Sequence, residues 1–90
     1  MNKRYNWSEE KNILLQKERN ISFEVVVQNL QDGNVIDIYE HPNRDKYPNQ
    51  KLVEVLINDY IWVVAFVESS DELFLKTAFP SRKANKKHKE

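Results

Sequence analysis

Residues 51–67 read KLVEVLINDYIWVVAFV and decide the fold, because they contain two apolar runs joined by a polar pair. Residues 51–57 and 60–67 are rich in β-branched and aromatic side chains, which favour strands. Asn58-Asp59 between them is typical of a two-residue hairpin turn. Residues 60–67 are apolar on both faces, which predicts a central strand.

Further strands are predicted on either side of this hairpin. Residues 35–40 alternate, and residues 73–79 form a last strand that ends at Pro80. Together the four segments predict an antiparallel meander. We expect the aliphatic face of the central strand (Ile61, Val63, Ala65, Val67) to meet the helices, and the aromatic face (Tyr60, Trp62, Phe66) to be partly exposed.

The first third of the chain predicts a short strand at residues 3–7 and a helical hairpin. Ser8 is suited to cap a helix through Arg19, with Ile13, Leu14 and Lys17 on its packed face. Ser22 begins a second stripe of apolar residues at helical spacing: Phe23, Val26, Val27 and Leu30. The β-branched run 25–27 leaves a strand as the alternative.

The last residues predict a short helix over 82–87, with a tail, residues 85–90, that frays. The whole is an α+β fold: a short N-terminal strand, a helical hairpin, a four-stranded antiparallel meander and a short C-terminal helix. At 90 residues we expect one domain, 1–90.

Composition excludes several classes of site. The chain has no cysteine, and its two histidines do not by themselves make a metal site. Its single glycine excludes a Walker loop and a dinucleotide fingerprint. No apolar run reaches the length of a membrane span, and no signal peptide is recognisable, so we expect a soluble cytoplasmic protein with no membrane association.

The charges are balanced in number but not in position. The chain carries 14 Lys and Arg and 14 Asp and Glu. Residues 80–90 hold five cations against one acid, and residues 1–79 hold nine against thirteen. The body therefore has a net charge of −4 and the C-terminal end +4. A polarised chain of this kind can bind a polyanion at one end only.

Three clusters are candidates for chemistry. Residues 41–50 form a long polar loop with His41, Arg44, Lys46 and Tyr47, and the alternative is a solvated loop stiffened by two prolines. Lys76 interrupts an apolar strand and must face solvent or a polar cleft, the alternative being an edge-strand lysine. The third cluster is the basic end, and the alternative there is a solubilising tail.

These residue types suit RNA cleavage without a metal or other cofactor. A base takes the 2′-OH proton, cations stabilise the phosphorane, and an acid protonates the leaving 5′-oxygen. His41 suits acid or base catalysis, and Lys76, Arg82 and Lys83 suit the charge. Further RNA contacts are expected from five residues: Arg44, Lys46, Tyr47, Lys51 and Lys86.

The chain resembles the BrnT family of bacterial ribonuclease toxins. Residues 5–12, YNWSEEKN, resemble that family's opening Phe-Glu-Trp-Asp-x-x-Lys-x motif. Lys17 and residues 20–24, NISFE, are similar to its Lys-His-Gly-Val-Ser-Phe-Glu segment, without the histidine and glycine. Residues 82–84, RKA, resemble its Ala-Arg-Lys-Ala ending, whereas Gln50-Lys51 stands where many members have Glu-Arg.

The resemblance implies a RelE-like fold, an endoribonuclease that inhibits translation, and neutralisation by a ribbon-helix-helix antitoxin of a type II toxin–antitoxin module. A heterotetramer with the antitoxin, or a homodimer through the exposed sheet face, is then expected. Two alternatives remain at this point. One is a non-catalytic protein- or RNA-binding module of the same fold, and the other is an RNA-binding protein that uses only its basic tail.

Overall fold

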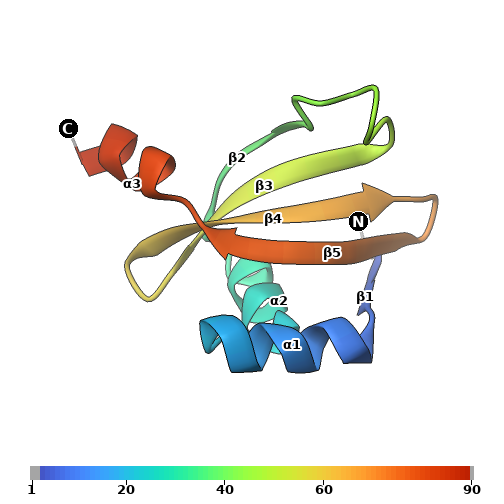
Figure 1. Ribbon diagram of the computed structural model, residues 1–90, viewed down its shortest axis with the longest axis horizontal. Helices are drawn as coiled ribbons and strands as arrows, with labels where there is room; N and C mark the ends of the chain where they lie inside the picture. Colours follow the sequence, from blue (N-terminus) through green and yellow to red (C-terminus); the bar gives the residue numbers. More distant parts are fainter. Residues whose placement is uncertain (1–2, 90) are drawn as a thin grey trace.

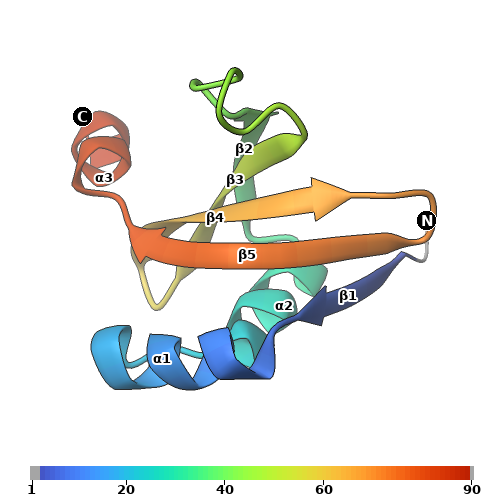
Figure 2. The same cartoon turned by 45° about the vertical axis from the view of Figure 1, so that its right-hand side comes forward.

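A computed structural model describes the backbone of residues 3–89 and the side chains of residues 3–86. Its elements in order are β1 (Arg4–Trp7), α1 (Glu9–Arg19), α2 (Phe23–Gln31), β2 (Val35–Glu40), β3 (Gln50–Ile57), β4 (Tyr60–Glu68), β5 (Glu72–Pro80) and α3 (Arg82–Lys89). Helices α1 and α2 cover one face of the sheet, and the β2–β3 loop and α3 rise on the other side (Figures 1 and 2).

The helical hairpin forms because polar side chains define where each helix begins and ends. The Ser8 hydroxyl accepts from the Lys11 N–H, and the Ser22 hydroxyl accepts from the Val25 N–H. Asn20 ends α1 in the left-handed region, at φ 56°, which asparagine tolerates better than most residues. The prediction of a second helix is confirmed, and the strand alternative for residues 25–27 is wrong.

Strands β2 to β5 form the predicted antiparallel meander. Asn58 and Asp59, at φ 52° and 66°, make the tight turn between β3 and β4. The sheet has a fifth strand, because β1 pairs in parallel with β5, and the strand order is β1-β5-β4-β3-β2. The sheet is therefore mixed, and the four-stranded description from the sequence was incomplete.

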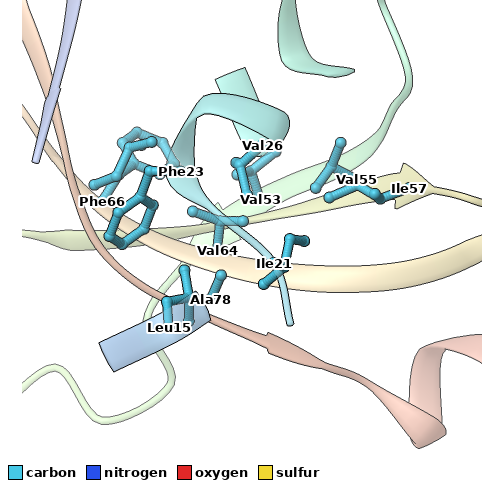
Figure 3. Close-up of a cluster of buried hydrophobic side chains, with 11 residues drawn as sticks. Leu15, Ile21, Phe23, Val26, Val53, Val55, Ile57, Val64, Phe66 and Ala78 are labelled. Carbon is cyan, nitrogen blue, oxygen red and sulfur yellow. The ribbon is translucent and has the colours of Figure 1, made fainter. Parts of the chain in front are cut away.

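The main core lies between the helices and the sheet, where buried aliphatic and aromatic side chains meet (Figure 3). Phe23 and Val26 of α2 are fully buried against Val64 and Phe66 of β4. The prediction that the aliphatic face of β4 meets the helices is wrong. The aromatic face does so, because large rings fill the space under two helices, whereas Val63 and Ala65 join Leu52 in a second cluster on the opposite face.

The packed face of α1 also differs from the prediction. Leu15 and Asn12 are buried, while Lys17, Ile13 and Leu14 are exposed. The physical reason is the amide of Asn12. It accepts from the Phe23 N–H at 2.8 Å and donates to a Glu24 carboxylate oxygen at 2.8 Å. This polar contact turns the helix so that Leu15, rather than Ile13 and Leu14, enters the core.

The last helix begins at Arg82 as predicted and continues to Lys89 rather than Lys87. Asn85, which the sequence placed in a fraying tail, is 8% exposed and bonded to β4. The last residue of that expected tail lies outside the described residues. Along the stretch that the structure describes, no helix has both the length and the apolar character needed to cross a membrane.

Candidate functional site

The candidate site is the face of the sheet opposite α1 and α2, which we call the open face. Its floor is the buried cluster of Leu52, Val63 and Ala65, from β3 and β4. The β2–β3 loop stands over one part of this face, and α3 stands over another (Figure 2). The open face is therefore flanked by a polar loop and a basic helix.

A groove of about 410 Å³ lies beneath the loop. Its walls come from the loop and from β3, β4 and β5. Most of the lining surface is apolar, and five of the lining residues have side chains able to form hydrogen bonds. The lining residues are His41, Pro42, Tyr47, Gln50, Leu52, Ala65, Lys76, Thr77 and Phe79.

Lys76 and Thr77 enter this groove side by side because β5 is irregular. Leu75 faces the helix-side core, so alternation places Lys76 on the open face, and a bulge adds Thr77 to the same face. Ala65 of β4 pairs with Thr77, but the next residue, Phe66, pairs with Leu75, so Lys76 is an extra residue without a partner on β4. A bulge of this kind redirects a side chain that regular alternation would send to the opposite face. Lys76 and Thr77 both line the groove as a result. The Lys76 ammonium also lies 5.3 Å from the ring centre of Phe74.

The loop is a folded unit that presents two stacked rings. The Tyr47 N–H donates to the Asn43 carbonyl at 2.9 Å, and the His41 N–H donates to the Gln50 carbonyl at 3.1 Å. These bonds place the His41 and Tyr47 ring centres 4.4 Å apart. The Lys46 ammonium lies 5.4 Å from the Tyr47 ring centre. The loop therefore carries a histidine, a phenol and a cation as one preformed group.

The hydrogen bonding of His41 defines which of its nitrogens faces a ligand. Nδ1 accepts from the Asn43 N–H at 3.0 Å. The neutral ring therefore carries its proton on Nε2, which is left as a donor. In this arrangement His41 can donate to an oxygen in the groove, but it cannot act as a base through Nε2.

A second cavity, of about 470 Å³, adjoins the groove on the side of α3 and shares Pro42 and Leu52 with it. Lys83 lines it, opposite three acidic residues and Tyr39. The Tyr39 hydroxyl donates to a Glu54 carboxylate oxygen at 3.1 Å. Burial and the Glu54 carboxylate raise the pKa of Tyr39 above its ordinary value. Its lining is Asp37, Tyr39, Glu40, Pro42, Leu52, Glu54, Ser81, Lys83 and Ala84.

Helix α3 is held beside this cavity by Asn85. Its side-chain oxygen accepts from the Ile61 N–H at 2.9 Å, and its amide donates to the Ile61 carbonyl at 3.1 Å and the Ser81 carbonyl at 2.7 Å. The side chain thus satisfies the backbone of β4 as a neighbouring strand would. Sequence reasoning missed this residue, because one asparagine among lysines carries no periodic signal.

The remaining predicted residues lie elsewhere. Arg44 and Lys51 line a cavity at the far end of β3, where Arg44 pairs with Glu40 at 2.9 Å and Lys51 with Glu68 at 3.5 Å. Lys3 and Lys51 hold the pKa of the Glu68 carboxyl below its ordinary value. Arg82 and Lys86 are exposed on α3 and line neither the groove nor the second cavity.

The structure therefore brings together His41, Tyr47 and Lys76, with Lys83 in the adjoining cavity. Among the residues it describes, no group of three or more histidine and acidic side chains is placed to hold a metal ion. Comparisons with protein-family models, with curated proteins and with solved structures found no match for this chain.

Proposed function

We propose that this protein is the toxin of a type II toxin–antitoxin module and that it cleaves RNA on its open face. The observation that supports this proposal is the groove on the open face. It brings Lys76 of β5 together with His41 and Tyr47, which come from a loop about thirty positions earlier in the chain. The α+β element order is also compatible with the RelE-like fold that the resemblance to BrnT toxins implies.

The proposed reaction is attack of an RNA 2′-oxygen on the adjacent phosphorus. The 2′-OH proton passes to solvent water, the new 2′-O–P bond forms as the bond to the 5′-oxygen breaks, and the 5′-oxygen takes a proton from water. The products are a 2′,3′-cyclic phosphate and a 5′-hydroxyl end. Lys76 stabilises the negative charge on the phosphorane, and Lys83 contacts a neighbouring phosphate. His41 donates a hydrogen bond from Nε2 to a phosphate oxygen. Tyr47 positions an unpaired base beside the groove.

A second candidate function is RNA binding without cleavage. It is favoured by the Asn43 N–H bond to Nδ1 of His41, because this bond leaves the groove without an imidazole base. Cleavage requires some group to take the 2′-OH proton, whereas binding requires only the cations and the apolar lining. The two functions use the same residues and differ in whether RNA is broken.

The resemblance also supports a partner and a location. A toxin that acts on translated RNA works in the cytoplasm, and a ribbon-helix-helix antitoxin encoded beside it would hold it inactive. A co-encoded antitoxin of this kind is the first outcome to look for when the protein is produced with its neighbouring reading frame.

The test combines an RNA digestion assay with growth after induced expression. The purified protein is incubated with single-stranded RNA labelled at one end, and the Lys76→Met, His41→Gln and Arg82→Ala variants are compared with wild type. Lys11→Met is the matched control, because Lys11 is exposed on α1 away from the groove. We expect Lys76→Met to lower the cleavage rate by about a hundredfold, as removal of one charge-stabilising group does in other enzymes.

The outcomes separate the candidates. Cleavage and growth arrest that depend on Lys76 but not on Lys11 support the toxin. Binding that depends on Lys76, without cleavage at any enzyme excess, supports the second candidate. If Lys76→Met and Lys11→Met behave as wild type in both binding and cleavage, the groove is not the RNA site.

A further inference from the structure

Strand β2 forms one edge of the sheet and is exposed along its whole length. All six of its residues are exposed, and Ile38, at 55%, is the most exposed of the large apolar side chains in the described structure. Val35, Ile36 and Tyr39 are 37–38% exposed. An edge with this composition presents apolar side chains together with backbone groups that face away from β3.

The direction of those backbone groups follows from the pairing with β3. The His41 N–H donates to the Gln50 carbonyl, so the backbone N–H of residue 41 faces β3. Because antiparallel strands alternate, the N–H and C=O of Ile38 and Glu40 point outward, away from β3. The Ile38 N–H is held by its neighbour's carboxylate, Asp37 Oδ1, at 2.9 Å.

The other edge of the sheet is the more protected of the two, although β2 has two acids and a bulge between Val35 and Asp37. Strand β1 has four residues and begins with Arg4, which pairs with Asp71 at 3.6 Å. Short length and a charged side chain are the usual ways in which proteins prevent edge pairing. Residues 35–40 contain neither lysine nor proline and are long enough for a full ladder.

The two faces beside β2 differ in chemistry. On the helix side, Val35 and Ile38 border an apolar groove of about 120 Å³, whose other walls are apolar side chains of α2, β1 and the sheet. On the open face, Asp37 and Tyr39 line the second cavity described above. A strand added beside β2 would therefore place alternate side chains in apolar and in acidic surroundings.

We propose that the β2 edge binds an extended segment of another protein whose residues alternate between apolar and basic. The apolar set would lie along Val35 and Ile38 and enter the helix-side groove, and the basic set would face Asp37. A second copy of this chain fits less well. Strand β2 carries two acids and no cation, so pairing of two β2 strands would place like charges beside each other. The proposal does not rest on RNA cleavage, because peptide binding is measured without RNA.

The test uses a fluorescent peptide of about eight residues that alternates Val or Leu with Lys, a length that spans β2. The key variant is Ile38→Pro. Since the Ile38 N–H points away from β3, proline there removes an outward donor and leaves the β2–β3 ladder intact. Ile38→Lys is the second variant, in case Ile38→Pro does not fold. Ile13→Lys is the matched control, because Ile13 is 53% exposed on α1.

We expect wild type and Ile13→Lys to bind the peptide equally, and Ile38→Pro and Ile38→Lys to bind at least about tenfold more weakly, a loss of about 1.4 kcal/mol. A peptide of the same composition without alternation, and one with Glu in place of Lys, should bind as weakly. Equal binding by wild type and both Ile38 variants, equal binding of the shuffled peptide, or no binding by wild type would overturn the proposal. So would sedimentation of wild type as a dimer that Ile38→Pro converts to a monomer, because the edge would then be filled by a second copy.

Discussion

At the residue scale, the two buried polar residues of the described chain perform one physical task. Asn12 and Asn85 are 2% and 8% exposed, and each side chain bonds to the backbone of a different element. A primary amide offers both donors and an acceptor, so one side chain can satisfy an N–H and a carbonyl together. Asn12 joins α1 to the start of α2, and Asn85 joins α3 to β4.

Replacing Asn12 should destabilise the helical hairpin. Asn12→Ala leaves the Phe23 N–H buried without its acceptor, which costs about 1–3 kcal/mol of the free energy of unfolding. Urea denaturation measures this loss. The control is Gln16→Ala, whose side chain is exposed on the same helix. A midpoint for Asn12→Ala equal to that of the control would contradict the argument.

The same amide predicts a pH dependence through Glu24. The hydrogen bond from Asn12 is the largest cause that holds the pKa of Glu24 below its ordinary value of 4.5. A carboxyl with a lowered folded pKa stabilises the protein above its ordinary pKa, and this contribution is lost as the pH falls through the folded value. Stability measured from about pH 6 to about pH 3 should therefore fall more steeply for wild type than for Glu24→Gln. Parallel curves would show that Glu24 contributes nothing.

Asn85 should control whether α3 stays on the sheet. Asn85→Ala removes three hydrogen bonds and leaves the Ile61 N–H without an acceptor, at a cost of about 1–3 kcal/mol. The control is Lys86→Ala, because Lys86 is the next residue of α3 and its side chain is exposed. Hydrogen exchange of the Ala84 amide reports the detachment directly, since its N–H donates to the Ser81 hydroxyl at the start of α3. Unchanged protection in Asn85→Ala would show that other contacts hold the helix.

At the scale of elements, the β3–β4 turn is strained by its own residues. Asn58 and Asp59 both have positive φ, and glycine is the residue that adopts this conformation without cost at the second position. Asp59→Gly should therefore raise the free energy of unfolding by about 1 kcal/mol, and Asp59→Val should lower it. Asp45→Gly is the control, because Asp45 is exposed in a loop without positive φ. Thermal unfolding of the three variants decides the matter.

The elements themselves were predictable where a local signal exists. Ser8, Asn20, Ser22 and the Asn58-Asp59 pair each act within a few positions, and the structure confirms all four. The orientation of the elements was not predictable, because it depends on contacts between residues far apart in the sequence. Nothing near Leu15 in the sequence shows that Asn12 will bond to Phe23 and turn α1.

The candidate site was predictable in part for the same reason. His41 and Tyr47 stand out in a long polar loop, and Lys76 stands out in an apolar strand. Their meeting in one groove depends on how the β2–β3 loop folds back over β5, which no pattern in residues 41–50 or 73–79 indicates. The ion pair of Lys51 with Glu68 is likewise tertiary, whereas Arg44 pairs with Glu40 only four positions away. Sequence reasoning counted both cations as available.

At the scale of the whole molecule, the basic C-terminal helix and acidic side chains of the sheet lie on the same face. The chain has a formal net charge of zero, yet α3 carries the basic end of the sequence and stands beside the open face (Figure 2). The acidic side chains of β2 and β3 line the second cavity, which Lys83 of α3 also lines. A polyanion therefore meets attraction from α3 and Lys76 and repulsion from the acidic body, which limits binding outside the groove.

This arrangement predicts how RNA binding depends on the basic tail. Deleting residues 86–90 removes Lys86, Lys87 and Lys89 but keeps Asn85, so the anchor of α3 survives. For single-stranded RNA, each lost phosphate contact should reduce the slope of log affinity against log salt by about 0.7. Binding to the groove should then weaken and become less sensitive to salt, but it should persist and remain dependent on Lys76. Titrations at several salt concentrations, with wild type and Lys76→Met in parallel, measure both effects. If the truncated chain no longer binds RNA at low salt, the tail alone is the RNA-binding element and the groove has another ligand.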